Sequence, residues 1–130
     1  MNRQMWVFVL ILLLGGAFFI GFASRNFSSG LLAAVKAPVY GPTNLIATQP
    51  TASSTTVRLT WQDKSTTESG FKIERGLATS SFSVIGQVAT NTVQYFDSRT
   101  VASTTYYYRV RAFNKGGYSP YSNTASVTTH

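Results

Sequence analysis

The sequence contains no cysteine, and this absence removes several classes of chemistry. Disulfides, thiolate zinc sites, cysteine nucleophiles and lipidation through cysteine are all excluded. Histidine is nearly absent too, because the one copy is His130, the last residue. Since terminal residues are seldom held in place, we expect neither a positioned imidazole base nor a Cys/His zinc set.

Acidic residues are scarce, with four Asp and Glu against 11 Lys and Arg, for a formal net charge of +7. All four acids, Asp63, Glu68, Glu74 and Asp97, lie in residues 42–130 together with eight of the basic residues, so this part carries 8 − 4 = +4. A charge of this size favours anionic surfaces weakly and is not typical of nucleic-acid binding, so no nucleic-acid partner is expected.

Catalytic and metal-binding signatures are missing as well. Asp63 and Glu68 fall in one predicted loop, but two carboxylates supply too few oxygens for a calcium site. The sequence has no Gly-x-Ser-x-Gly elbow and no phosphate-binding loop. We therefore expect no catalytic residue, no metal and no cofactor.

Charge is missing altogether from residues 5–23, which are almost entirely apolar. As a helix they would extend about 28 Å, close to the roughly 30 Å of a bilayer's hydrocarbon core. We predict that residues 1–23 form one hydrophobic helix that enters a membrane, at least transiently. Ala17 and Gly21 give a small-xxx-small pair for helix packing, a spacing that is common by chance.

Two interpretations of this segment remain open. A retained anchor with its amino terminus inside fits the length and the basic start at Arg3, and the protein would then contact the membrane through residues 5–23. A cleaved signal peptide fits Gly21 and Ala23, with cutting before Ser24. In either case residues 24–41 are a linker, and the following domain lies outside the cytoplasm, either membrane-anchored or secreted and periplasmic.

From residue 42 to residue 130 the pattern changes to strict alternation of apolar and polar residues. Val57–Trp61, Phe71–Glu74 and Tyr106–Ala112 each alternate, and aromatic and β-branched residues are frequent in them. Alternation of this kind indicates strands with one buried face. We predict seven strands, at residues 43–49, 55–62, 70–76, 82–89, 93–97, 104–113 and 121–129. Short strands with frequent turns and no helical period indicate an all-β antiparallel sandwich.

Four ordered motifs in this region resemble a fibronectin type III domain, similar to those of secreted bacterial proteins. They are Leu59–Trp61, Gly70–Arg75, Thr105–Ala112 and Tyr118–Ala125. The resemblance covers about two-thirds of the chain, roughly 42–130, and implies a seven-stranded immunoglobulin-like sandwich.

The resemblance also implies roles for individual residues. Trp61 and Tyr108 become core residues, and Tyr106 becomes a tyrosine-corner residue whose hydroxyl bonds back to the preceding backbone. The family favours Leu-x-Pro before that tyrosine, whereas this chain has Thr100-Val101-Ala102. We expect Val101 to supply the missing apolar contact.

The candidate binding site is a surface. Alternation places Tyr107, Arg109 and Arg111 outward on the strand 104–113, and Lys72 and Glu74 outward on the strand 70–76, which the family pairs beside it. This gives a basic, aromatic-edged strip suited to an anionic partner. The alternative is a solvated face with Lys72 packed over Tyr107. Loop residues form a second candidate contact point, namely Lys115, Tyr118 and Tyr121.

Three functions agree with these features. The first is a non-catalytic, surface-displayed module for adhesion or binding to an extracellular protein or polysaccharide. The second is a structural or assembly subunit of an envelope complex or filament. The third is an accessory to an enzyme encoded elsewhere. A fold does not by itself select among them.

Overall fold

The computed structural model describes residues 39–130. The predicted hydrophobic helix, its cleavage point, the Ala17–Gly21 pair and most of the linker lie outside the described residues. The described part of the chain contains strands and turns only, and therefore no helix there is long and apolar enough to cross a membrane.

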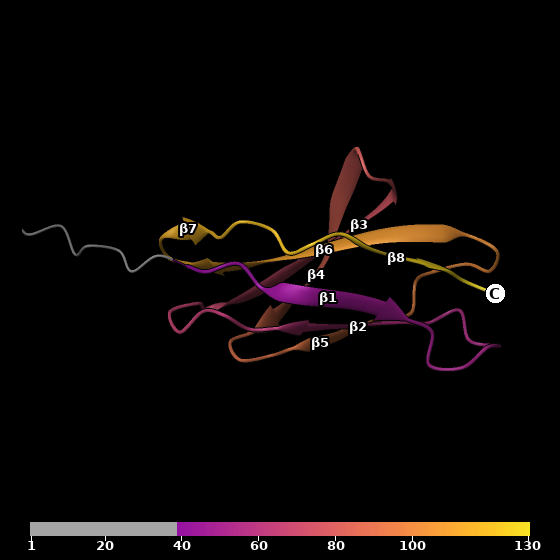
Figure 1. The fold of residues 1–130 in the computed structure, drawn as a ribbon, viewed down its shortest axis with the longest axis horizontal. Helices are drawn as coiled ribbons and strands as arrows, with labels where there is room; N and C mark the ends of the chain where they lie inside the picture. The colour runs from indigo at the N-terminus through magenta and orange to yellow at the C-terminus, as the bar shows by residue number, and fades with distance from the viewer. Residues whose placement is uncertain (1–38) are drawn as a thin grey trace, which may run out of the picture. The chain divides into compact units, whose positions relative to one another are not determined.

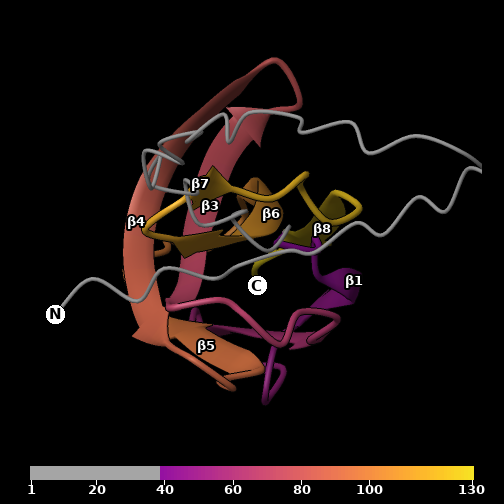
Figure 2. The same ribbon diagram turned by 90° about the vertical axis from the view of Figure 1, so that its left-hand side faces the viewer.

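Two antiparallel sheets form the domain (Figure 1). One sheet has the order β1-β2-β5, with β1 at Thr43–Thr48, β2 at Val57–Gln62 and β5 at Gln94–Asp97. The other has the order β4-β3-β6-β7, and β8 also pairs with β6. Its strands are β3 at Gly70–Ala78, β4 at Ser81–Ala89, β6 at Thr105–Asn114, β7 at Gly117–Tyr118 and β8 at Ala125–Thr128. Figure 2 shows β3 and β4 on one side and β1 on the other. The predicted all-β sandwich is confirmed for the described residues.

The core lies between the sheets and follows from the alternation. In β2, Val57, Leu59 and Trp61 are buried while Arg58 is exposed. In β6, the four alternate positions from Tyr106 to Ala112 are buried. The rings of Trp61 and Phe71 lie 5.6 Å apart between centroids and join the two sheets. A buried aromatic side chain such as Trp61 typically contributes about 3–5 kcal/mol, so these residues stabilise the fold.

The start of β3 requires a glycine. Gly70 has φ of 155°, and a Cβ there would lie 2.2 Å from the Val88 carbonyl oxygen. Because the neighbouring β4 backbone approaches this closely, no larger residue fits without displacing β4.

The last predicted strand, 121–129, is shorter than predicted, because only β8 at Ala125–Thr128 forms within it, and the two-residue β7 before it was not predicted. Between β7 and β8 the segment from Ser119 to Thr124 has no strand geometry, although it stays beside β6. Ser119 donates its N–H to the Ala112 carbonyl at 2.9 Å, and its Oγ accepts the Ala112 N–H at 2.9 Å. Ser122 does the same with Val110, at 2.8 and 3.0 Å. Serine hydroxyls therefore replace backbone carbonyls as acceptors, and the period becomes three residues instead of two.

The tyrosine corner differs in detail from the expectation. The Val101 N–H donates to the Tyr106 hydroxyl at 3.1 Å. Val101 does not fill a buried apolar position as expected, since the residue is 63% exposed. Thr100 is buried instead, and its hydroxyl donates to the carbonyl of Thr55. The expectation for Val101 was wrong because a threonine can occupy a buried position when its hydroxyl finds a backbone acceptor.

A buried carboxylate joins the two sheets at β5. Asp97 is 1% exposed, and its Oδ2 accepts from Arg75 Nη1 at 2.8 Å and from the Tyr108 hydroxyl at 3.1 Å. Its Oδ1 accepts the Arg99 N–H at 3.1 Å. Burial raises the pKa of Tyr108, and the neighbouring Asp97 charge raises it further, so the hydroxyl remains a donor.

Candidate binding face

The register of β3 and β6 brings the predicted strip together. Lys72 pairs with Arg111, and Glu74 pairs with Arg109. Tyr107 pairs with Gly76 and is half-buried. Cross-strand partners point to the same face of a sheet, so these residues share the outer face of the five-stranded sheet.

Glu74 lies beneath this face instead of in solvent. Its side chain is covered by its neighbours, and the residue is 4% exposed. Oε2 accepts a hydrogen bond from Arg109 Nε at 2.8 Å, and Oε1 accepts one from the Tyr121 hydroxyl at 2.9 Å. Ion pairs add Arg109 Nη2 at 2.7 Å from Oε2 and Arg111 Nη2 at 3.2 Å from Oε1. The position faces outward as predicted, but two long arginines and a tyrosine close over the shorter side chain.

Aromatic rings and cations alternate above Glu74. The Arg109 guanidinium carbon lies 3.7 Å from the centroid of Tyr121 and 4.3 Å from that of Phe82. The Arg111 guanidinium carbon lies 3.9 Å from Tyr118 and 4.8 Å from Tyr121. Lys72 Nζ ends the series, 5.2 Å from Tyr118. We call this group the outer stack; its members are Phe82, Arg109, Tyr121, Arg111, Tyr118 and Lys72.

The tyrosines of the outer stack respond to their charged neighbours. A hydrogen bond and the positive charge of Lys72 lower the pKa of Tyr118. Burial raises the pKa of Tyr121, and its hydrogen bond to Glu74 raises it further. The two rings are therefore different chemically: Tyr121 is an internal donor, whereas Tyr118 stands at the rim and is 53% exposed.

The predicted surface residues divide into two groups. The outer stack contains Lys72, Arg109 and Arg111 from the predicted strip, and it also takes in Tyr118 and Tyr121, which were predicted as part of a separate loop contact. Lys115 stands exposed on the β6–β7 turn.

Two features of this face differ from the sequence-based expectation. Lys72 lies near Tyr118 and Phe113, so the alternative of Lys72 packed over Tyr107 was wrong. Phe82 was not predicted as part of this face. Its position on β4, two residues from the exposed Val84, was the available signal.

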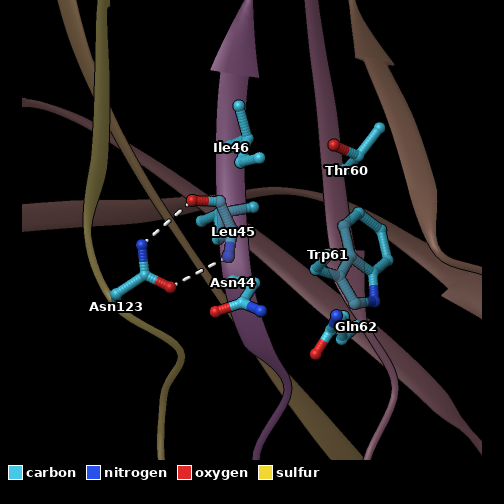
Figure 3. A pocket seen from close by; sticks show the side chains of 7 residues that line it. All are labelled: Asn44, Leu45, Ile46, Thr60, Trp61, Gln62 and Asn123. Atoms are coloured by element: carbon cyan, nitrogen blue, oxygen red, sulfur yellow. Dashed lines mark hydrogen bonds between the residues drawn. The ribbon is translucent and has the colours of Figure 1, made fainter.

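A shallow hollow lies at the opposite sheet, beside β1 and β2 (Figure 3). Its volume is about 490 Å³. The Asn123 amide spans one side, accepting the Leu45 N–H and donating to the Leu45 carbonyl, both at 2.9 Å. Trp61 Nε1 has no hydrogen-bond partner among the described residues, but this atom is fully buried and a ligand in the hollow cannot reach it. The hollow therefore offers mainly apolar contact.

The β2–β3 loop holds the two acids predicted to be too few for calcium. Asp63 accepts the Ser65 N–H at 2.9 Å, which closes a turn. Glu68 accepts from the Thr90 hydroxyl at 2.6 Å and from the Asn91 N–H at 3.3 Å. Residues 39–130 contain no cluster of three or more potential metal ligands. Both carboxylates therefore stabilise turns between strands by accepting hydrogen bonds.

Comparison with known proteins identifies relatives of the sandwich. The family model of the fibronectin type III domain matches residues 40–128. An Fn3-like protein from Clostridium thermocellum is 26% identical with a TM-score of 0.61, covering 72% of this chain and 95% of that one. No curated protein matches the sequence.

More distant structures share the fold alone. Domains A168–A170 of titin are 24% identical with a TM-score of 0.59, covering 71% of this chain but 32% of the titin fragment. The pectate lyase Pel3 from Pectobacterium carotovorum is 15% identical with a TM-score of 0.58, covering 69% of this chain and 27% of that one.

Proposed function

Since the chain belongs to the fibronectin type III domain family, as its motifs predicted, we propose that it is a non-catalytic module displayed outside the cytoplasm that binds a carbohydrate or protein partner. Domains of this family are common in surface and extracellular proteins, and they are typically non-catalytic modules. The proposal therefore needs a surface on this particular chain that is suited to recognition.

The outer stack supports the proposal because it is both ordered and basic. Two guanidinium groups and one ammonium lie over a single carboxylate, Glu74, so the face carries a net charge of 3 − 1 = +2. Each arginine lies against aromatic rings and a carboxylate oxygen, which fixes its rotamer before any partner arrives. A pre-ordered surface loses less conformational entropy on binding.

The binding function is tested by a survey of ligands. The full chain in nonionic detergent would be applied to an array of acidic and neutral glycans and to solubilised envelope proteins. We expect saturable binding to at least one partner at micromolar concentration, weakened by Arg109→Ala with Arg111→Ala. Absence of binding to every glycan and protein would refute the proposal.

The proposed location outside the cytoplasm has its own test. The intact mass would be measured in native membrane and fluid fractions. A full-length mass in membranes indicates an anchor, and a mass beginning at Ser24 in the fluid indicates a cleaved signal peptide. Recovery of full-length protein from the cytoplasm would contradict both.

A further inference from the structure

All four carboxylate side chains of the chain are engaged within the domain. Asp97 pairs with Arg75, and Glu74 pairs with Arg109 and Arg111. Glu68 accepts a hydrogen bond from the Thr90 hydroxyl, and Asp63 accepts one from the Ser65 N–H. Among the described residues, no ion pair includes Lys72. Lys72 is therefore available to a carboxylate of another molecule.

The surroundings of Lys72 suit a particular kind of carboxylate. Lys72 Nζ lies 5.2 Å from the centroid of the Tyr118 ring, and its positive charge lowers the pKa of the Tyr118 hydroxyl. Arg111 packs against the same ring at 3.9 Å and holds it in place, while 53% of Tyr118 remains exposed. An ammonium donor, a phenolic hydroxyl and open aromatic surface therefore meet at one point.

We propose that Lys72 and Tyr118 bind a hexuronate unit of an acidic polysaccharide. This inference rests on the proposed binding function and specifies its ligand. The sugar carboxylate accepts from Lys72 Nζ and the Tyr118 hydroxyl, and the C–H face of the sugar ring packs against the exposed part of the Tyr118 ring. An amphipathic tyrosine provides both the polar and the apolar contact.

The same chemistry favours a polysaccharide over an acidic peptide. A hexuronate carries its carboxylate on a rigid ring that has an apolar face, so both contacts form at once. An aspartate or glutamate side chain has no such face, and it loses rotamer freedom when bound. Acidic peptides are expected to bind through charge alone, and more weakly.

The test measures binding of polygalacturonate to the full chain in nonionic detergent, by titration calorimetry at fixed salt. Lys72→Gln is expected to weaken binding at least about tenfold, whereas Lys72→Arg keeps the charge and stays within about threefold. Tyr118→Ala is expected to lose about tenfold, and Tyr118→Phe, which keeps the ring, distinctly less. Lys64→Gln is the matched control, because Lys64 is an exposed lysine of the β2–β3 loop and is not a member of the outer stack, so its loss should leave binding within about twofold. Thermal unfolding followed by circular dichroism confirms that each variant is folded.

Two further ligands test the specificity. Methyl-esterified polygalacturonate lacks the charge, and poly-glutamate lacks the sugar ring; both are expected to bind at least about tenfold more weakly. Equal losses in Lys64→Gln and Lys72→Gln, or equal binding of poly-glutamate, would overturn the inference. If polygalacturonate fails to bind while another glycan or protein in the survey binds, the inference is wrong and the proposed function stands. If nothing binds, both are wrong.

Discussion

Replacement of Asp97 by alanine is expected to remove a large part of the domain's stability. The carboxylate is almost completely buried and accepts three hydrogen bonds, from Arg75, Tyr108 and Arg99. Alanine leaves the buried Tyr108 hydroxyl without an acceptor, a loss of about 1–3 kcal/mol. Arg75 loses its counter-charge, although it keeps a hydrogen bond to the Arg99 carbonyl and a ring contact with Tyr106.

The size of the stability loss in Asp97→Ala follows from the two groups that lose their partner, Tyr108 and Arg75. Removal of one partner from a buried ion pair typically costs about 3–5 kcal/mol. Because 23% of the Arg75 side chain is exposed and can be hydrated, we place the Asp97→Ala loss at the lower end, about 3 kcal/mol. Tyr108→Phe removes only one neutral donor and is expected to cost about 1 kcal/mol.

Urea unfolding followed by tryptophan fluorescence measures both losses, and Trp61 is a core reporter. The expected order is Asp97→Ala, then Asp97→Asn, then Tyr108→Phe, from largest to smallest loss. A double-mutant cycle between Asp97→Ala and Tyr108→Phe isolates their coupling. A loss below about 1 kcal/mol for Asp97→Ala, or a larger loss for Tyr108→Phe, would refute this account of the network.

Three further outcomes are expected. Glu74→Gln keeps the shape of the side chain but leaves two arginines without a counter-charge, and the free energy of unfolding should fall by about 1–2 kcal/mol. This loss should be smaller at high salt, because salt screens the charges of hydrated arginines. An unchanged urea midpoint would contradict a buried role for Glu74. For Glu68, burial raises the pKa, but hydrogen bonds from Thr90 and Asn91 outweigh this effect, so the folded pKa lies below the usual value. The stability that Glu68 contributes is then present above the unfolded pKa and is lost as the pH falls through the folded pKa. Glu68→Gln should therefore reduce the fall of the urea midpoint at acidic pH. Tyr118 should ionise at lower pH than an unperturbed tyrosine, and Lys72→Ala should raise its pKa in an ultraviolet difference titration; no change would place Lys72 away from the hydroxyl.

The strands were predictable because one face of each is buried. Alternation located β2 and β6 to within one or two residues, since residues such as Leu59 and Val110 must point inward. The late start of the last strand, β8, was not predictable from alternation. It depends on Ser119 and Ser122 accepting hydrogen bonds with their hydroxyls, which an apolar-polar pattern does not distinguish from ordinary outward serines.

Most members of the outer stack were predicted as surface residues, Phe82 excepted, but their contacts were not predictable. The pairing of β3 with β6 follows from the family, and it brings Lys72 beside Arg111. The burial of Glu74 depends on side-chain length, since arginine reaches over glutamate from the next strand. The Asp97 network was not foreseen at all, because it depends on which of the charged residues point inward near a sheet edge, and burial pattern alone does not give this.

The segment between β7 and β8 combines the geometry of a loop with the length restriction of a regular strand. Loops usually tolerate insertions and deletions. Here Tyr118 and Tyr121 reach the same face because they stand three positions apart, with two residues between them, and Arg111 lies between their rings. Deletion of Pro120 would shift Tyr121 by one step, moving its ring away from Arg109 and its hydroxyl away from Glu74. Homologous domains that keep the arginines of β6 should therefore vary in residue identity at position 120 and not in the number of residues between the two aromatic positions.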